Sequence, residues 1–503
     1  MEERGASVGE MVLLTDTHAV ASGDSTKAAA PDPVPLVVDL DGTLLRTNSL
    51  IESLFVLART KPSTLFKLPV WWMRGRALFK HRLAAAVMPD VHWLPFRVGL
   101  LEFLREQKRL GRTLILATGA DEKLAREVDR EVGLFDDVKA SDGIVDLSGE
   151  RKRDRLVADF GPRGFDYIGH DGRDYEVWCS ARRALLASPS PHLLQIVGER
   201  TPVEKVFTDI RARWQDYLDA LRPLHWVKNT LVFVPLVAVH RVFEFALVGR
   251  ALLAFIAFNM CASGLYLLND LLDLPADRRH PQKKTRMLAA GRIPLGYALL
   301  MMPILTLGAF AVGSYLSIAF AGVLALYTAL MIGYSMRLKD IALVDVLVLA
   351  GGYALRVAAG AAASDIRISA WLLTLCVFLF FSLALIKRYA ELIVLESEPG
   401  GGSAHARGYL GTDKVVLVAQ GIASGYLAVM VLALYTNTPI SQHLYAHHDY
   451  FWGVCLLLLY WVSYLWMAAT RGRIAGDPVI FALSDRGSRW TIVGMGLLAA
   501  LSI

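Results

Sequence analysis

The chain has 503 residues, of which 54% are hydrophobic, and its formal net charge is +6. This length allows two domains, or one large membrane body with a soluble domain attached. A positive charge can indicate a nucleic-acid partner, but the Lys and Arg residues lie mostly in short loops between apolar segments, and no basic face interleaved with aromatic residues stands out. The composition therefore favours a membrane protein and argues against nucleic-acid binding.

Hydropathy divides the chain into two halves. Residues 1–220 are mixed and charged, whereas apolar runs of membrane-spanning length dominate 224–503. The first residues lack a basic stretch followed by an apolar core, so the sequence predicts no signal peptide. We expect four parts: a disordered tail over 1–33, an α/β domain over 34–200, a linker or amphipathic segment over 201–221, and an all-α membrane domain over 222–503.

The cysteines show no pattern of their own. There are four, at Cys179, Cys261, Cys376 and Cys455, and they form neither a CxxC pair nor a framework spacing. The sequence thus argues against disulfides and against a zinc site.

Three strands of the first half are each predicted to end at polar residues. The segment LVVDLDGTL contains Asp39 and then Asp41, and a second strand, TLILAT, ends at Thr118. A third, FDYIGH, runs into Asp171 and Asp174. Because the carboxyl ends of parallel strands meet at one edge of a sheet, we expect these side chains to lie close together.

Lys152 stands between the second and third of these strands. With the strand-end residues it completes a set that phosphoryl chemistry can use: a nucleophilic carboxylate, a carboxyl for proton transfer, a hydroxyl and an ammonium for the phosphoryl group, and acids for Mg²⁺. The pattern DxDGT in this context resembles the haloacid dehalogenase-like phosphatase superfamily. The resemblance covers 34–200, with a helical cap inserted at 48–100.

The resemblance implies a role for each residue of this set. Asp39 would be the nucleophile, Asp41 the general acid and base, Thr118 and Lys152 the phosphate binders, and Asp39, Asp41 and Asp174 the acids of a metal site. One motif departs from the family pattern, because the usual Gly-Asp pair is replaced by Gly169-His170-Asp171. Either Asp171 substitutes after a one-residue shift, or metal binding is weakened; a retained fold with little activity is a further alternative.

Nine apolar segments of the second half are predicted to cross a membrane. They cover 228–246, 249–268, 294–312, 315–335, 343–362, 369–387, 415–436, 450–469 and 490–503. The last is short and the first is broken by His240 and Arg241, so eight spans are the alternative. Loops after even-numbered spans hold about sixteen Lys and Arg, against about three in the other loops. These loops and the N-terminal half are therefore predicted to be cytoplasmic, in a bacterial-type cytoplasmic membrane.

The segment NDLLDLPADRRHPQKKTR directly follows an apolar run. Asn269, Asp273 and Asp277 are spaced by four residues, so on a helix they share one face. Acids at the end of an apolar helix are costly to leave unpaired, and Mg²⁺ on a phosphate-rich ligand would offset that cost. The basic residues behind them would meet phosphate oxygens, and they are His280, Lys283, Lys284 and Arg286. The alternative is a solvated loop with ordinary charges.

Further polar groups lie at the ends of the predicted spans or within them. They are Lys228 and Asn229 before the first span, Tyr334, Lys339 and Asp345 around the loop after the fourth, Arg356 inside the fifth, and Lys387 with Arg388 at the end of the sixth. Basic residues at such places also serve as orientation signals or snorkel to the interface. Arg356 needs either an anionic ligand or an internal ion pair, and the sequence leaves both open.

Together these motifs resemble the UbiA superfamily of intramembrane prenyltransferases over 215–503. The motif N-D-x-x-D-x-x-x-D with YSxxLK carries the resemblance, and RPxxWxKN, HPxKxxR and KR-x-x-E are most similar to its decaprenyl-phosphate phosphoribosyltransferase branch. The resemblance implies helices around a lipid-facing cavity that is capped by two Asp-bearing loops. It also implies transfer of a phosphoribosyl group from phosphoribosyl pyrophosphate to a polyprenyl phosphate.

On this interpretation Mg²⁺ lies on the pyrophosphate of the donor, with Asp273 and Asp277 as the catalytic acids. The predicted metal ligands are Asn269, Asp273, Asp277 and Asp345. The predicted substrate contacts are Lys228, Asn229, His280, Lys283, Lys284, Arg286, Tyr334, Lys339, Arg356, Lys387 and Arg388. A phosphatase in the same chain would remove the 5-phosphate of the product at high effective concentration.

Two alternatives remain open. An enzyme of the same superfamily could move a prenyl group from its diphosphate to an aromatic ring, but such enzymes usually carry a second acid pair spaced DxxxD, and Asp340 and Asp345 are five apart. A transporter or lipid-binding scaffold is the other, although no convincing internal repeat is visible. The sequence leaves open the lipid length, the exact donor and the oligomeric state.

Overall fold

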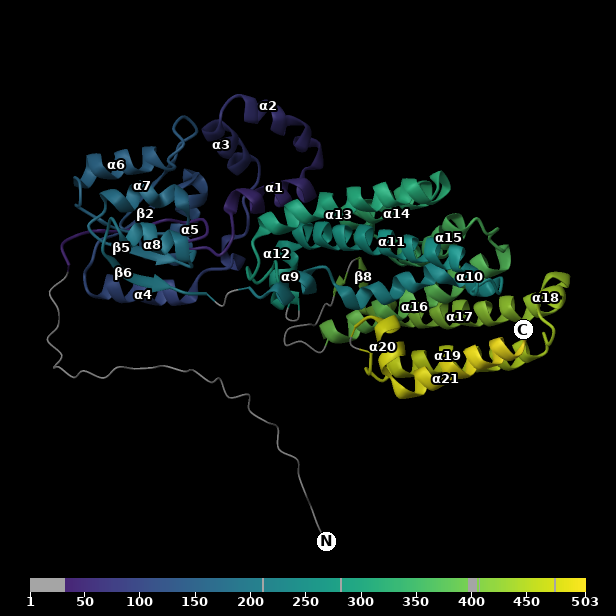
Figure 1. Ribbon diagram of the computed structural model, residues 1–503. Helices are drawn as coiled ribbons and strands as arrows, with labels where there is room; N and C mark the ends of the chain where they lie inside the picture. The colour runs from purple at the N-terminus through teal and green to yellow at the C-terminus, as the bar shows by residue number, and fades with distance from the viewer. Residues whose placement is uncertain (1–31, 210–211, 281–282, 397–404, 407, 475) are drawn as a thin grey trace, which may run out of the picture.

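The computed structural model describes residues 32–503 except for 210–211, 281–282, 397–404, 407 and 475 (Figure 1). The predicted tail over 1–33 lies outside the described residues apart from its last two positions. A domain built on a β-sheet sits at one end of a bundle of long helices. The chain passes from one to the other through α9 (Trp214–Ala220).

The N-terminal domain contains six parallel strands. They are β1 (Leu36–Val38), β2 (Leu114–Asp121), β3 (Asp137–Ser141), β4 (Asp166–Gly169), β5 (Ala184–Ala187) and β6 (Val203–Phe207), in the spatial order β3-β2-β1-β4-β5-β6. In β1, Val38 is in register with Leu116 on one side and Ile168 on the other. The strand order reverses at β1, which is where open parallel sheets place their sites.

Neighbouring side chains of β1 build a core on each face of the sheet. Leu36 and Val38 pack with α4 (Val98–Arg109) and α5 (Glu122–Val132). Val37 lies between them and packs on the opposite face, which is covered by α6 (Glu150–Phe160), α7 (Tyr175–Ser180) and α8 (Pro191–Gly198). This division follows from the two-residue period of a strand. The predicted α/β, Rossmann-like fold class is confirmed.

A helical cap is inserted between β1 and α4, as expected. It consists of α1 (Ser49–Thr60), η1 (Pro62–Lys67), α2 (Leu68–Met73), α3 (Arg76–Ala86) and η2 (Val91–Trp93). Asn48 begins α1 because its side chain accepts a hydrogen bond from the Ile51 amide at 3.1 Å. Gly75 separates α2 from α3 with φ of +117°, a conformation that glycine adopts without steric cost.

Seven helices within the described residues are long and apolar enough to cross a membrane. They are α11 (Phe245–Leu272), α13 (Leu295–Leu316), α14 (Ile318–Met336), α15 (Val344–Ser364), α16 (Ala370–Glu396), α17 (Lys414–Thr436) and α19 (Tyr450–Thr470). They run together along one direction in Figure 1. The predicted all-α polytopic membrane domain is confirmed.

The first and last of the nine predicted spans are shorter than expected. The segment 228–246 contains the end of a 3₁₀ helix, η4 (Pro223–Phe233), and only five residues of α-helix, α10 (Val234–Ala238). His240 follows with φ of +59°, a left-handed conformation that ends the helix. The C-terminal helix α21 (Arg486–Leu501) has 16 residues, below the ~20 that a bilayer core needs.

Short elements connect these helices. They are η3 (Gly172–Asp174), α12 (Leu274–Arg279), η5 (Lys283–Thr285), η6 (Leu338–Asp340), β7 (His405–Ala406), β8 (Tyr409–Leu410), η7 (Gly411–Asp413), α18 (Pro439–Leu444) and α20 (Pro478–Ser484). The Asp-rich segment spans the end of α11 and all of α12.

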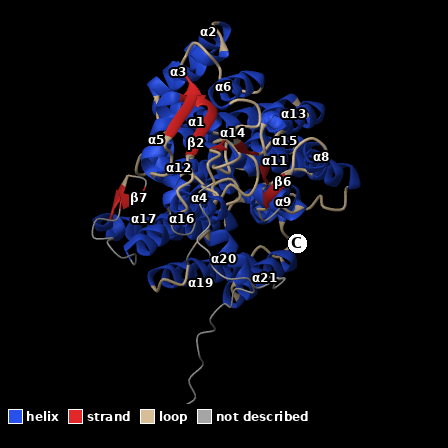
Figure 2. Ribbon diagram, turned by 90° about the vertical axis from the view of Figure 1, so that its left-hand side faces the viewer, coloured by secondary structure: helices blue, strands red, loops and turns tan. Residues whose placement is uncertain are grey.

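The cap contacts the helix bundle directly. Phe55 of α1 packs against an apolar cluster that includes Leu271 of α11 and Leu295 at the start of α13. Beside it, the Arg278 guanidinium donates two hydrogen bonds to the buried Glu52 carboxylate, at 2.6 and 3.1 Å. Figure 1 shows α1 and α12 at the same end of the bundle, and the view turned by 90° shows them close together (Figure 2). The N-terminal domain therefore covers the end that carries the Asp-rich segment.

Candidate active sites

The first site lies at the carboxyl edge of the N-terminal sheet. Asp39 follows β1, Thr118 lies in β2, and Asp174 follows β4, so the parallel register brings them to one edge. The Lys152 ammonium from α6 donates to Asp39 Oδ1 at 2.8 Å and reaches Asp174 Oδ1 at 3.4 Å. All four line a cavity of about 530 Å³. The structure thus brings together residues that the sequence placed on three separate strands and one helix.

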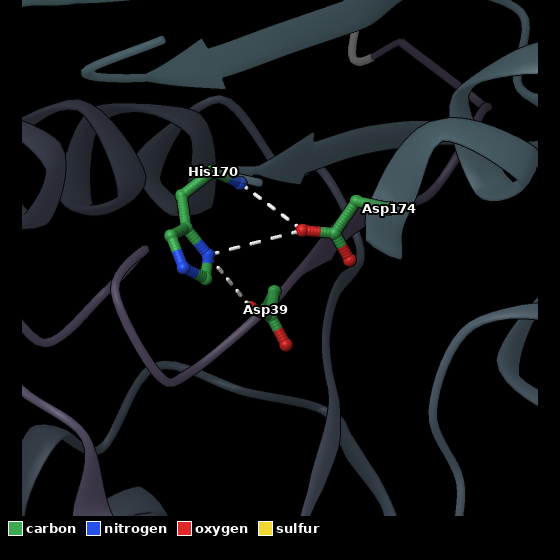
Figure 3. Close-up of side chains that lie close together, drawn as sticks. All are labelled: Asp39, His170 and Asp174. Carbon is green, nitrogen blue, oxygen red and sulfur yellow. Dashed lines mark hydrogen bonds and ion pairs between the residues drawn. The ribbon is translucent and has the colours of Figure 1, made fainter. Parts of the chain in front are cut away.

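His170 stands in the motif Gly169-His170-Asp171, which differs from the usual Gly-Asp pair, and its side chain points into this site (Figure 3). Its Nδ1 lies 3.6 Å from Asp39 Oδ2 and 3.9 Å from Asp174 Oδ2. The imidazole fits because residue 42 is Gly, since a Cβ there would lie 2.3 Å from the ring. Asp171 instead accepts a hydrogen bond from the Arg173 amide at 2.8 Å and begins η3. His170, rather than Asp171, therefore takes the inner position.

Asp41 lies beside this group but serves a different contact. Its carboxylate accepts hydrogen bonds from the Ser49 amide at 2.7 Å and the Ser49 hydroxyl at 3.0 Å, at the start of α1. Burial, opposed by these bonds, raises the pKa of Asp41 to about 6. Burial acts on Asp39 too, but the Lys152 ammonium and His170 hold the pKa of that carboxyl well below its usual range. Two neighbouring carboxyls with separated pKa values can divide into a nucleophile and an acid.

A metal ion would find three ligands at this site. Asp39, His170 and Asp174 each offer one ligand atom, and these atoms lie within 4.8 Å of one another. The two carboxylates fit Mg²⁺, whereas an imidazole nitrogen is a ligand more typical of transition metals. The Asp41 carboxylate, predicted as a further metal ligand, is not in this group and bonds Ser49 instead.

The second site is a cavity of about 620 Å³ that is lined by residues of the helix bundle and by Arg59 of the cap helix α1. Among the described residues its wall carries eight Lys and Arg side chains and five Asp and Glu side chains. The basic ones are Arg59, Arg222, Lys228, Lys283, Arg286, Lys339, Arg356 and Lys387. Leu265, Met331 and Leu349 form apolar parts of the wall. The cavity is suited to a ligand with a polyanionic head and an apolar tail.

The acids of the Asp-rich segment face cations across this cavity. The Lys339 ammonium donates to both oxygens of Asp273, at 2.6 and 2.7 Å, and to Asn269 Oδ1 at 3.2 Å. Arg286 bonds Asp277 at 2.6 Å and Asp270 at 3.1 Å. The two loops that carry these residues, one after α11 and one after α14, therefore meet as the sequence predicted.

Four predicted site residues are not on the cavity wall. Asp345 is fully buried and forms an ion pair with Arg388, while the Tyr409 hydroxyl donates to it at 2.5 Å. This pairing satisfies the Asp345 carboxylate within the protein, and neither Asp345 nor Arg388 lines the cavity. Asn229 lies behind the wall, and Lys284 in η5 is outside it.

Arg356 lines the cavity without a carboxylate partner among the described residues. It donates to Asn229 Oδ1 at 2.6 Å, to the Gly352 carbonyl at 2.6 Å and to the Tyr327 hydroxyl at 3.0 Å. Its guanidinium also lies 5.3 Å from the centroid of the Tyr353 ring. Neutral acceptors and aromatic faces hold the side chain but leave its charge uncompensated. Of the two alternatives left open, an anionic ligand fits better than an internal ion pair.

Arg59, Arg222 and Asp477 are among the charged residues of the cavity wall that the sequence did not assign to the site. Arg59 of the cap helix pairs with Asp273, and Arg222 pairs with Asp270. Asp477, before α20, pairs with Lys228. Arg222 belongs to the motif RPLHWVKN. No local pattern marks Arg59 or Asp477, because their partners, Asp273 and Lys228, lie 214 and 249 positions away in the sequence.

Several known proteins are similar to the chain. The uncharacterized protein y4nM of Sinorhizobium fredii is 32% identical over 461 residues, 91% of this chain and 89% of that protein. The decaprenyl-phosphate phosphoribosyltransferase of Mycolicibacterium smegmatis is 30% identical over 287 residues, 54% of this chain and 86% of that enzyme. The first match is longer than the membrane half alone, so the joining of the two halves is shared with that relative.

Solved structures match each half separately. A UbiA homolog from Archaeoglobus fulgidus bound to GPP and Mg²⁺ covers 57% of this chain and 96% of its own, with 15% identity and a TM-score of 0.42. A phosphoserine phosphatase in apo form covers 35% of this chain and 94% of its own, with 13% identity and a TM-score of 0.26. The family model described as the UbiA prenyltransferase family matches residues 230–484. Since that match spans half of the chain, the chain belongs to the UbiA prenyltransferase family.

Proposed function

We propose that the membrane domain transfers a phosphoribosyl group from phosphoribosyl pyrophosphate to a polyprenyl phosphate. The surplus of cations on the cavity wall carries this proposal. A prenyl diphosphate presents one diphosphate, whereas the proposed donor carries a diphosphate and a separate 5-phosphate, and the acceptor adds a third anionic group. The similarity to enzymes named decaprenyl-phosphate phosphoribosyltransferase, at 30% and 38% identity, supports the same choice.

Asn269, Asp273 and Asp277 would hold Mg²⁺ on the pyrophosphate of the donor. The ion would neutralise charge that develops on the leaving group. Lys339 and Arg286 bond these acids in the structure, and both side chains line the cavity, where phosphate oxygens offer them alternative acceptors. His280 and Lys283, also on the wall, would contact the 5-phosphate. Fixed cations around a departing pyrophosphate supply the main catalytic requirement.

The acceptor phosphate would bind beside Lys228 and Arg356, with the polyprenyl chain along the apolar wall. One of its oxygens attacks C1 of the ribose, the C1–O bond breaks, and pyrophosphate leaves with the bonding electrons. A phosphate is already anionic at neutral pH, so the reaction needs no strong general base. The uncompensated charge of Arg356 stabilises the anion before and after transfer.

We infer that the N-terminal domain then removes the 5-phosphate of the lipid product. An oxygen of Asp39 attacks phosphorus, and the ribose oxygen leaves with a proton from Asp41. Water then cleaves the aspartyl phosphate, with Asp41 taking the proton back. Lys152, at 2.8 Å from Asp39, would hold the phosphoryl oxygens. The separated pKa values of Asp39 and Asp41 support this division of roles.

Prenyl transfer from a diphosphate to an aromatic ring is the second candidate, since the matching family model is described as a prenyltransferase family. Of the second acid pair, Asp340 lines the cavity, but Asp345 is paired with Arg388. Of this second pair only Asp340 therefore reaches the wall, whereas such a site would need both members. We also propose that the N-terminal domain is cytoplasmic, where phosphoribosyl pyrophosphate and Mg²⁺ are found.

Radiolabelled donor tests the proposal in purified membranes with Mg²⁺. Label from phosphoribosyl pyrophosphate should enter the lipid phase only with polyprenyl phosphate present, and Asp273→Asn should lower the rate at least about 100-fold. Asp449→Asn, a change at an 88% exposed side chain outside the cavity, is the control. Label entering an aromatic acceptor from a prenyl diphosphate instead would support the second candidate.

A further inference from the structure

The cap of the phosphatase domain carries an exposed apolar surface on η1 and α2. Phe66 is 88% exposed, Met73 77%, Trp72 53% and Val70 44%. Four large apolar side chains within eight positions, all facing outward, are unusual for a water-facing segment. We call this group of four residues the cap surface.

The charged side chains of the chain segment that carries the cap surface are all basic. Between Glu52 and Asp90 the sequence contains seven Lys and Arg and no acidic residue. Lys61, Lys67, Arg74 and Arg76 flank the cap surface and are exposed. A basic, aromatic-rich surface is complementary to anionic lipid headgroups, because apolar rings enter the headgroup boundary while Lys and Arg stay with the phosphates.

The position of the cap places this surface at the level of a membrane boundary. Helix α1, which leads into η1, packs through Phe55 on the cluster that contains Leu295, the first residue of the membrane-spanning helix α13. The buried Glu52–Arg278 pair fixes α1 there. In Figure 1 α2 stands to the side of the long helices, and the view turned by 90° again places it at the outer edge of the molecule (Figure 2). A surface at this level and at the outer edge of the molecule is within reach of lipid headgroups around the bundle.

The same segment also forms the wall of the phosphatase cavity. Trp72 and Arg76, with Phe79 and Leu83 of α3, line the cavity whose other end holds Asp39. The Trp72 and Phe79 rings pack edge to face with centroids 5.3 Å apart. An apolar wall that continues from the cap surface to the nucleophile can accept a phosphate that remains attached to a lipid.

We propose that the cap surface binds anionic lipid headgroups beside the helix bundle, so that the phosphatase takes phosphorylated lipids directly from the bilayer surface. The substrate class, a lipid-linked phosphomonoester, rests on the phosphatase activity proposed above, whereas the membrane contact does not. Binding at the bilayer removes the need for the lipid product to leave the membrane before Asp39 attacks it. Binding of a water-soluble phosphate ester to the phosphatase cavity should not depend on this surface.

Fluorescence in lipid nanodiscs tests the membrane contact without using activity. Phe66→Cys and Met73→Cys, each in a Cys179→Ser background of the full chain, are labelled with an environment-sensitive fluorophore. Asp154→Cys is the control, because this exposed residue lies on α6, away from the bundle. Spin-labelled lipid should reduce emission from the two cap sites about twofold or more, as expected at interfacial depth. The loss should be larger with phosphatidylglycerol than with phosphatidylcholine alone, and it should be absent at the control site.

An equal loss of emission at the cap and control sites when spin-labelled lipid is added would overturn the proposal. A cap label that is shielded from water but not quenched by lipid would also overturn it, because that result would indicate a second protein copy. A second assay addresses the substrate class. Phe66→Ser/Met73→Ser should lower hydrolysis of the lipid-linked phosphate about tenfold and leave 4-nitrophenyl phosphate hydrolysis unchanged. Leu110→Ser, at a 40% exposed side chain outside the cap, should change neither. Lipid quenching without any hydrolysis by the unaltered protein would reject the phosphatase and retain the membrane contact.

Discussion

Arg59 of the cap on the N-terminal domain forms an ion pair with Asp273 of the membrane-domain cavity, and it also lies 3.5 Å from Asp340. One domain thus supplies a cation to the candidate site of the other. Helix α1 carries both Arg59, in its last turn, and Ser49, whose amide and hydroxyl donate hydrogen bonds to Asp41 of the site in the N-terminal domain. A single helix of 12 residues therefore touches both sites.

Removing the Arg59 side chain should weaken binding of the pyrophosphate donor. Arg59→Ala takes one cation from the cavity, and a charge-assisted hydrogen bond contributes about 1.5–3 kcal/mol, so the KM for phosphoribosyl pyrophosphate should rise about tenfold or more. Steady-state transfer of label into lipid measures the effect. Arg59→Lys should recover part of it. Lys61→Ala, two positions along, should leave KM unchanged, and an equal rise there would assign the effect to surface charge.

The Glu52–Arg278 pair should hold the cap against the bundle. Both side chains are buried, and breaking a buried pair leaves an uncompensated charge at a cost of about 3–5 kcal/mol. Arg278→Ala should therefore increase hydrogen exchange in α1 and slow release of the 5-phosphate from lipid. Arg279→Ala provides the matched control, because its pair with Asp90 is exposed and contributes less than about 1 kcal/mol. Unchanged exchange in the first variant would show that the pair does not fix the cap.

The phosphatase rate should depend on pH through Asp41. Its carboxyl must be protonated to donate to the leaving ribose oxygen, so the rate should fall as pH rises through its pKa, which burial raises to about 6. The two hydrogen bonds from Ser49 stabilise the charged carboxylate and hold that pKa down. Ser49→Ala removes one of them, and the descending limb should move up by about one pH unit.

Profiles of kcat/KM on 4-nitrophenyl phosphate measure this shift. Ser53→Ala is the control on the same helix, since among the described residues that hydroxyl donates to the Ser49 carbonyl and not to Asp41. A limb that moves down in Ser49→Ala, or that moves equally in the control, would contradict the assignment of Asp41 as the acid.

His170 should set the metal preference of the phosphatase site. Its Nδ1 faces Asp39 and Asp174 in a place where a carboxylate would favour Mg²⁺. His170→Asp should lower the Mg²⁺ concentration for half-maximal thermal stabilisation about tenfold, while His170→Asn, without a charge, should not. Stronger Mg²⁺ binding by the unaltered protein than by His170→Asp would reject the imidazole as the cause.

Strand ends and residue spacing in the sequence were enough to predict the N-terminal sheet edge and the two loops that meet over the membrane-domain cavity. The strand ends at Asp39 and Thr118 meet because parallel strands share an edge, and Asn269 and Asp273 meet Lys339 because two loops close over the same cavity. Asp345 could not be placed in this way. Its spacing fitted a metal ligand, but burial on α15 beside Arg388 of α16 satisfies its charge within the protein.

Contacts between the two domains could not be predicted from the sequence either. Arg59 lies in a segment whose sequence is that of an ordinary amphipathic helix, and its contact depends on how α1 packs against α11. The first predicted span is not a long helix, and the reason is local. The 3₁₀ geometry after Pro223 and the left-handed His240 interrupt an apolar run whose composition fits a span.

The central claim is that one chain transfers phosphoribose to a membrane lipid and then removes its 5-phosphate. Phosphoribosyl pyrophosphate labelled with ¹⁴C in the ribose and ³²P in the 5-phosphate tests both steps at once in nanodiscs with polyprenyl phosphate and Mg²⁺. We predict that ¹⁴C accumulates in lipid while ³²P is released to water, that Asp39→Asn retains both labels in lipid, and that Asp273→Asn leaves lipid unlabelled. Absence of ¹⁴C from the lipid of the unaltered protein would contradict the transferase. Equal ³²P retention with and without Asp39 would contradict the coupled phosphatase.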